Sequence, residues 1–227
     1  MRKLWILIFL MVFGASVFGQ VSKPRNLPVF DALPAHLGYS VGINMMGFTY
    51  VANEGYDVSV VQNPGLNINL VTSFKLAKYL DLRFLPGIQF GQRNVTIKSK
   101  LSLEEWDARI ESVYIDLPIL VKYRAQRINN YAPYLIAGVN PRFDLTGGEI
   151  DDWKPAKRLI KAFDLMPELG VGLDFYLAKV KISTELKFAI GLMNIYQAPD
   201  DEEEYNLYSK AFDRIMSRMV IFSINIG

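Results

Sequence analysis

Alternation of apolar and polar residues, repeated in eight segments, constrains this chain more than any other feature. In residues 180–191 one face carries Val180, Ile182, Thr184, Leu186, Phe188 and Ile190, and the other carries Lys181, Ser183, Glu185, Lys187, Ala189 and Gly191. A β-strand turns successive side chains to opposite faces, so this period of two predicts a strand. The same pattern occurs in residues 37–45, 66–74, 82–90, 113–123, 133–143, 163–176 and 220–226.

The connections between these segments alternate in length. Residues 77–79, 125–130 and 177–179 form short predicted turns, whereas residues 52–63, 96–108, 146–162 and 194–215 form long predicted loops. After residue 19, no stretch offers the roughly 18 consecutive apolar residues that a membrane-spanning helix needs. Short turns at one end and long loops at the other are typical of membrane barrels with an even number of strands. We therefore predict an all-β fold, an eight-stranded antiparallel up-and-down transmembrane β-barrel.

Periodicity alone leaves open whether the apolar face points to lipid or into the ligand cavity of a soluble lipocalin-like barrel. Two features of the polar face favour lipid. It is rich in glycine, which suits a crowded narrow lumen: Gly38, Gly42, Gly87, Gly91, Gly138, Gly170, Gly172 and Gly191. It also carries charges of both signs that a lumen could pair: Arg83, Asp116, Lys122, Arg142, Glu168, Glu185 and Lys187. Tyrosines near the strand ends are predicted to form an interfacial girdle: Tyr79, Tyr123, Tyr131 and Tyr176.

The N-terminus has the pattern of a secretory signal peptide. Arg2 and Lys3 precede an apolar run over residues 4–13, and Gly19 supplies a small residue for cleavage. A membrane anchor is the alternative, but this run is shorter than the roughly 20 residues a spanning helix needs. We expect residues 1–19 to be a signal peptide, residues 20–35 an extended periplasmic lead-in segment, and residues 36–227 a barrel in the outer membrane.

Composition excludes several kinds of chemistry. The chain has no cysteine and one histidine, His36, so thiolate metal sites, cysteine nucleophiles and clusters of histidines are excluded. The net charge of +2 equals the contribution of Arg2 and Lys3, so no basic patch for nucleic acid is indicated. We expect no metal, cofactor, nucleic acid or small-molecule substrate, and outer-membrane lipid as one partner.

Two short motifs could carry chemistry. Residues 38–42 read Gly-Tyr-Ser-Val-Gly, the pattern of a hydrolase nucleophile elbow, with His36 nearby. An elbow needs a turn from strand to helix, whereas alternation here is unbroken, and His36 and Ser40 lie about 13 Å apart along one strand. Ser73 or Ser223 could meet His36 from another strand, which leaves a lipid hydrolase as the less favoured reading. The acidic run at residues 200–204 lacks the spacing of a calcium loop, and we predict no catalytic, cofactor-binding or metal-binding residue.

Several short sequences resemble those of the PorT family of outer-membrane barrels. They are residues 26–31, 36–39, 81–87, 91–94, 111–112, 117–118, 122–124, 127–130, 172–176 and 183–187. The most specific are Arg-Ile-Asn-Asn at residues 127–130 and Ser-Thr-Glu-Leu-Lys at residues 183–187. The resemblance implies an outer-membrane component of the type IX secretion system, which exports folded cargo bearing a C-terminal sorting domain.

The family supplies no catalytic residues to transfer, so the resemblance implies a non-enzymatic protein with other secretion-system proteins as partners. A barrel of eight strands is about filled by its own side chains, so folded cargo cannot pass through it. We therefore expect an assembly or accessory factor rather than the pore. The alternatives are a structural or adhesive barrel and, less favoured, an outer-membrane lipid hydrolase.

Overall fold

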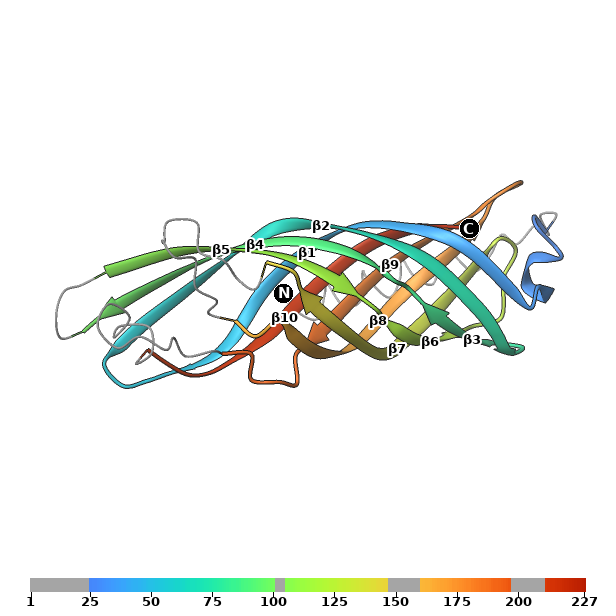
Figure 1. Cartoon of the computed structure of the whole chain (residues 1–227). Coiled ribbons are helices and arrows are strands. Elements are labelled where there is room, and N and C mark those ends of the chain that lie inside the picture. Colours follow the sequence, from blue (N-terminus) through green and yellow to red (C-terminus); the bar gives the residue numbers. More distant parts are fainter. Residues whose placement is uncertain (1–24, 101–104, 147–159, 197–210) are drawn as a thin grey trace, which may run out of the picture.

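The computed structural model describes residues 25–100, 105–146, 160–196 and 211–227, which form one antiparallel sheet of ten strands (Figure 1). The strands are β1 (Ala35–Ala52), β2 (Tyr56–Ala77), β3 (Leu80–Phe84), β4 (Gly87–Ser99), β5 (Glu105–Asp116), β6 (Ile119–Arg124), β7 (Tyr131–Asp144), β8 (Phe163–Tyr176), β9 (Lys181–Ile190) and β10 (Phe212–Ile226). A short 3-10 helix, η2 (Phe30–Ala32), precedes them. Within these residues, no helix has the length and apolar character needed to cross a membrane.

The ten strands occupy eight positions around the barrel, and we call the strand or the pair of consecutive strands at each position a stave. β3 and β4 both pair with β2 and are separated by Leu85 and Pro86, while β5 and β6 both pair with β7 and are separated by Leu117 and Pro118. Proline has no N–H to give to the ladder, so each break falls where a strand loses a donor. The prolines still accept bonds, since Leu70 N–H donates to the Pro86 carbonyl at 2.9 Å and Leu85 N–H to that of Pro118 at 3.0 Å.

The staves close into a barrel. β1 pairs with β2 on one side and with β10 on the other, and the remaining staves follow the order of the chain. Closure satisfies the backbone groups that an open sheet would leave unpaired at its edges. The predicted eight-stranded antiparallel barrel is confirmed.

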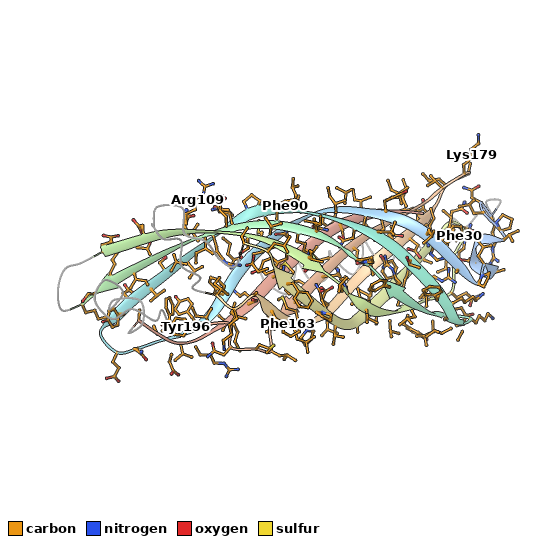
Figure 2. All side chains as sticks on the ribbon, in the orientation of Figure 1. Phe30, Phe90, Arg109, Phe163, Lys179 and Tyr196 are labelled. Carbon is orange, nitrogen blue, oxygen red and sulfur yellow. The ribbon has the colours of Figure 1, made fainter. Side chains whose placement is uncertain are left out.

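The apolar face points outward, as the sequence indicated. Leu37 and Tyr39 on β1 are 67% and 69% exposed, whereas Ser40 between Tyr39 and Val41 is 2% exposed. Phe90 and Phe163 likewise project from the outer wall (Figure 2). An outer surface of this kind requires an apolar solvent, so the lipocalin-like alternative is excluded.

The inner face is crowded at its glycines. A Cβ added at Gly138 would lie 2.1 Å from the Ile119 carbonyl oxygen, and one at Gly42 would lie 2.3 Å from that of Phe222. Both contacts are with backbone atoms that cannot swing away. The interpretation of the glycine-rich face as a tight lumen is confirmed.

Three of the predicted long loops are wrong in extent: β10 begins at Phe212, inside the loop predicted for residues 194–215, and two other loops are largely strand. β1 continues to Ala52, the chain turns through three residues that end at Gly55 (φ 102°), and β2 begins at Tyr56, so most of residues 52–63 is strand. β4 likewise reaches Ser99 and β5 begins at Glu105, inside the loop predicted for residues 96–108. These strands project beyond the rest of the barrel at the end opposite the three short turns (Figure 1).

This projection, which we call the distal extension, has the opposite polarity to the barrel wall. Its interior is an apolar core: Phe48, Val58, Val95, Ile97, Ile110, Ile160, Ile195, Ala211, Phe212 and Ile215. Its outer face carries charged pairs, Lys98 with Glu105 and Arg109 with Glu111. The extension is therefore packed like a water-soluble sheet, with apolar side chains inside and charges outside.

A bulge in β2 accounts for part of this inversion. Between Asn63 and Leu66 the register slips, so that three steps along β2 match two along β4. The extra residue exchanges the faces of β2, since Leu66 is exposed whereas Val58, at the same parity, is buried.

Candidate functional site

The lumen holds buried ion pairs between staves that are distant in sequence. Arg83 Nη1 on β3 donates to Glu185 Oε2 on β9 at 2.7 Å, and both side chains are buried. Lys187 Nζ donates to Glu168 Oε2 at 2.7 Å. The prediction that the lumen pairs its charges of opposite sign is confirmed for these two pairs.

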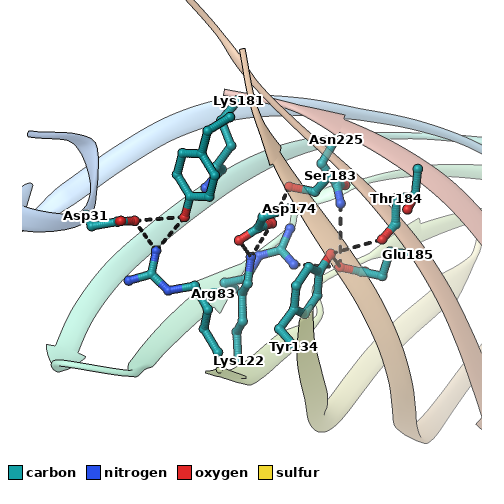
Figure 3. Close-up of polar contacts among 12 residues, drawn as sticks. Asp31, Arg83, Lys122, Tyr134, Asp174, Lys181, Ser183, Thr184, Glu185 and Asn225 are labelled. Atoms are coloured by element: carbon teal, nitrogen blue, oxygen red, sulfur yellow. Dashed lines mark hydrogen bonds and ion pairs between the residues drawn. The ribbon is translucent and has the colours of Figure 1, made fainter. Parts of the chain in front are cut away.

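Other lumen charges have partners that the sequence did not identify. Lys122 Nζ donates to both carboxylate oxygens of Asp174, each at 2.8 Å, rather than to a glutamate (Figure 3). Arg142 Nε lies 3.3 Å from Asp116 Oδ1, and its guanidinium lies 3.5 Å above the ring of Tyr114. Alternation identified which residues face inward, but the register between staves decides which of them meet.

Neutral side chains complete the network. The Tyr134 hydroxyl donates to Glu185 Oε2 at 2.9 Å, and Asn140 Nδ2 donates to Glu168 Oε1 at 2.8 Å. Ser183 Oγ donates to Asp174 Oδ1 at 2.6 Å. Each of these three carboxylates thus receives bonds from both a cation and a neutral donor, which offsets the cost of burying charge.

The space left inside the barrel is small. A cavity lined in part by His36, Arg83 and Lys181 has a volume of about 20 Å³, little more than one water molecule requires. A second cavity, within the core of the distal extension, also measures about 20 Å³. The described side chains fill the interior, as expected for eight strands.

The Ser-His motif is not arranged for catalysis. Ser40 lies in the middle of β1, opposite Asn225 on β10 and Asn69 on β2, and not in a turn. His36 Nε2 lies 3.2 Å from Lys181 Nζ, and the imidazole packs against Phe30 with ring centroids 4.9 Å apart. His36 is opposite Ser73 in register, yet across the described residues no serine hydroxyl is hydrogen-bonded to it.

No metal site emerges either. In the described parts of the chain, no group of three or more histidine, aspartate and glutamate residues is arranged to hold a metal ion. The acidic run at residues 200–204 lies outside the described residues.

Two of the four tyrosines predicted to form an interfacial girdle are exposed, and the girdle itself stays a prediction. Tyr123 and Tyr131 are 57% and 51% exposed, and Tyr79 is half-buried in the turn between β2 and β3. The prediction that Tyr176 belongs to this girdle is wrong, because its side chain is 1% exposed and points inward. Alternation along β8 explains this, since Phe175 occupies the outward position and Tyr176 therefore faces the lumen.

The end of the barrel with the short turns is covered by residues 25–34, the described part of the lead-in segment that was predicted to be extended. This part instead forms η2 and folds over the mouth (Figure 1). Asp31 forms ion pairs with Arg124 and, at 3.6 Å, with Arg127, and its carboxylate accepts a hydrogen bond from the Tyr176 hydroxyl at 2.8 Å. Asn26 Nδ2 also donates to the Tyr176 carbonyl at 2.9 Å. We call this set of contacts the mouth clamp.

The electrostatics of the mouth clamp favour an ionised Asp31. Partial burial acts to raise the pKa of its carboxyl, but the hydrogen bond from Tyr176 and the charges of Arg124 and Arg127 outweigh burial and lower it. Sequence reasoning missed the clamp. The available signal was an aspartate beside a proline-rich segment and arginines at one strand end, and it does not specify the pairing.

Comparison with known proteins identifies the family. Residues 18–197 match the family described as outer membrane protein beta-barrel domain. This chain belongs to that family. Its outer surface and closed strand order fit an outer-membrane location, and the proposed signal peptide lies outside the described residues and stays a prediction.

Solved structures show the same fold. The outer membrane protein OprG from Pseudomonas aeruginosa superposes with a TM-score of 0.50 at 11% identity, over 84% of this chain and 93% of that one. Ail, the attachment invasion locus protein of Yersinia pestis, gives 0.40 at 10% identity over 86% and 99%, and the outer membrane enzyme PagL gives 0.29 at 9% over 81% and 97%. The last two likenesses are too weak to carry an argument, and all three concern the fold alone.

A curated sequence relative adds nothing to the assignment. The chain is 26% identical over 172 residues to the highly reducing polyketide synthase sorA of Penicillium rubens, a match that covers 71% of this chain and 6% of that protein. The chain thus spans a small fraction of that relative's length, at an identity that shows no shared family.

Because the chain belongs to a family of outer-membrane barrels, the general rule for such barrels indicates which end faces the periplasm. In bacterial outer-membrane barrels the short turns face the periplasm and the longer loops face outside. The mouth clamp therefore lies at the periplasmic end, and the distal extension lies on the extracellular side.

Proposed function

We propose that this barrel is a non-enzymatic component of the type IX protein secretion system, required for export of sorting-domain cargo as an assembly or accessory factor. The structural observation that carries the second half of this proposal is the filled lumen. Ion pairs such as Arg83–Glu185 connect opposite parts of the wall and occupy the space that a translocated polypeptide would need. A protein of this shape acts through its two ends and its outer wall.

The assignment to type IX secretion is supported by the resemblance to the PorT family. Two of its more specific sequences fall at structurally demanding places. Arg127, in the Arg-Ile-Asn-Asn turn, belongs to the mouth clamp, and Glu185, in the Ser-Thr-Glu-Leu-Lys strand, binds Arg83. The residues that resemble the PorT family therefore include some that form lumen contacts and some that lie at the periplasmic mouth. This placement is expected if the resemblance in sequence reflects a shared barrel structure.

The test is a gene deletion with complementation. Sorting-domain proteins are quantified in the periplasm and the medium of the wild type, the deletion strain and strains complemented with variants. We expect cargo to accumulate in the periplasm of the deletion strain, and the wild-type gene and His36→Ala to restore export equally. Normal export in the deletion strain would refute the secretion role.

A structural or adhesive role is the second candidate, and the distal extension favours it. Its apolar core and charged outer surface make a folded platform on the extracellular side. Unchanged export together with a loss of surface attachment on deletion would support this candidate.

A lipid hydrolase is the less favoured candidate. Ser40 faces asparagines, and His36 contacts Lys181 and Phe30 rather than a serine hydroxyl. A changed lipid A mass on deletion, restored by the wild-type gene but not by His36→Ala, would revive it.

A further inference from the structure

A basic groove opens at the periplasmic mouth, beside the mouth clamp. It has a volume of about 370 Å³, within the range of pockets that hold ligands. Among the described residues, five cationic side chains line it, Arg25, Lys75, Lys78, Arg124 and Arg127, and Asp31 is the one carboxylate. We call this feature the periplasmic groove.

Within the part of the chain that the structure describes, three of these five cations have no carboxylate partner. Asp31 pairs with Arg124 and Arg127, whereas Lys75 donates to the uncharged Asp31 carbonyl. Arg25 and Lys78 are exposed, and neither has an ion pair within the described residues. Asp81 is opposite Lys75 in register, but it is buried and does not line the groove, so positive charge remains in excess.

The mouth clamp shows what chemistry the periplasmic groove recognises. The Asp31 carboxylate is held there by two guanidinium groups and by the Tyr176 hydroxyl, which is how proteins bind carboxylates. The chain thus supplies one acidic side chain to its own groove and leaves room and charge for more.

The direction of the side chains favours a ligand from the aqueous periplasm over a lipid headgroup. On β2 the exposed Phe74 takes the lipid-facing position and Lys75 the inward one, and on β6 the exposed Tyr123 precedes the inward Arg124. Pro28 and Ala32 of the lead-in segment form another wall, so the groove lies over the mouth of the barrel.

We propose that the periplasmic groove binds an acidic segment of a periplasmic partner protein, whose aspartate or glutamate side chains pair with Arg25, Lys75 and Lys78. This proposal deepens the proposed function, because an accessory factor that is not a pore needs a surface for its partners. Its biological interpretation rests on that function, while binding itself is measurable without it.

The experiment measures binding of a fluorescent hexaglutamate peptide to the purified protein in phosphatidylcholine nanodiscs, by anisotropy. The test variant carries Arg25→Glu and Lys78→Glu, both at exposed positions outside the strands. The control is Lys179→Glu, which reverses an exposed charge in the periplasmic turn between β8 and β9 but does not line the groove (Figure 2). Heat-dependent migration on gels verifies that all three proteins are folded.

We expect saturable binding that weakens with added salt, about tenfold weaker binding by the double variant, and less than a twofold change for the control. Absence of saturable binding would overturn the proposal, and so would equal losses in the double variant and the control. Abolition of peptide binding in nanodiscs that contain phosphatidylglycerol would assign the groove to lipid headgroups and overturn it too.

The two proposals fail in different ways. If the periplasmic groove binds no acidic peptide while deletion still traps cargo, the secretion role stands and the partner surface lies elsewhere. If the peptide binds as expected but export is normal in the deletion strain, the groove is real and the secretion role is wrong.

Discussion

Replacement of Glu185 by glutamine tests whether the lumen network stabilises the barrel as a set of buried ion pairs. The carboxylate accepts from Arg83 at 2.7 Å and from Tyr134 at 2.9 Å, and the side chains of the ion pair are 3% and 0% exposed. Glu185→Gln keeps the shape but leaves the Arg83 charge buried without a counter-ion. Removal of one partner from a buried pair costs about 3 to 5 kcal/mol. Because the glutamine oxygen still accepts from Arg83, we expect about 3 kcal/mol.

The assay is urea unfolding of the barrel in phospholipid vesicles, followed by the migration of folded and unfolded protein on gels. With a slope of about 2 to 3 kcal/mol per molar, a loss of about 3 kcal/mol lowers the midpoint by about 1 to 1.5 M. The slope itself should not change, because the area exposed on unfolding is the same.

A matched control is Glu111→Gln in the distal extension. Arg109 and Glu111 are as close as the lumen pair, at 2.6 Å, but both side chains are 52% exposed. Exposed pairs contribute about 0 to 1 kcal/mol, so the midpoint should move by less than about 0.5 M. Equal shifts for the two variants, or a shift below 0.5 M for Glu185→Gln, would refute the reasoning that burial makes the lumen pair sensitive.

Three further predictions concern packing, pH and conductance. Gly138→Val should prevent folding, because its Cβ would meet the Ile119 carbonyl oxygen at 2.1 Å, whereas Gly227→Ala, with its nearest atom at 3.5 Å, should fold normally; heat-dependent gel migration decides. The Asp31 contribution to the mouth clamp should be fully present above pH 3.8, the ordinary pKa of aspartate, and disappear as the pH falls through the lowered pKa of the folded state. After correction for the intrinsic exchange rates, the backbone amides of residues 26–33 should therefore be less protected from hydrogen exchange at pH 2.5 than above pH 3.8. Asp31→Asn should remove this difference in protection. Finally, the purified barrel should show no discrete conductance steps in planar bilayers, and steady channels of wild-type protein would contradict the filled lumen.

The sequence was sufficient to predict the barrel because its strands face two very different solvents. Residues such as Leu37 and Ile43 are exposed on the outer wall, while Ser40 and Asn44 are buried in the lumen. Alternation therefore specifies both the strand and which of its side chains point outward. Proline breaks at Pro86 and Pro118 divide two staves without changing which residues face lipid. For this reason eight predicted segments correspond to eight staves, although the structure contains ten strands.

The distal extension could not be predicted in the same way. Above the membrane the favourable face reverses, and the bulge between Asn63 and Leu66 reverses the parity of β2 as well. Continuous alternation is lost at that point, although the strand continues to Tyr56. The loss of periodicity therefore predicted a loop at residues 52–63, where the structure has a bulged strand.

The mouth clamp depended on information that is absent from any local pattern. Asp31 and Tyr176 are 145 residues apart, and Asp31 and Arg124 are 93 apart. Only the closed order of the staves brings Tyr176 at the end of β8 and Arg124 at the end of β6 to one mouth. A pattern can indicate that charges lie at strand ends, but it cannot pair them across the barrel.

The filled lumen also determines where functional variants should be sought. Arg83, Lys122 and Lys187 are buried in ion pairs, so their substitution changes folding before it changes any interaction with a partner. Loss of export in such variants would therefore say little about mechanism unless the amount of folded barrel were unchanged. Exposed residues at the two ends do not have this problem, and the periplasmic groove and the distal extension lie at opposite ends. Substitutions at Arg25 and Lys78 that reduce export, with Arg109 substitutions that do not, would place the working surface in the periplasm, and the reverse would favour the adhesive role.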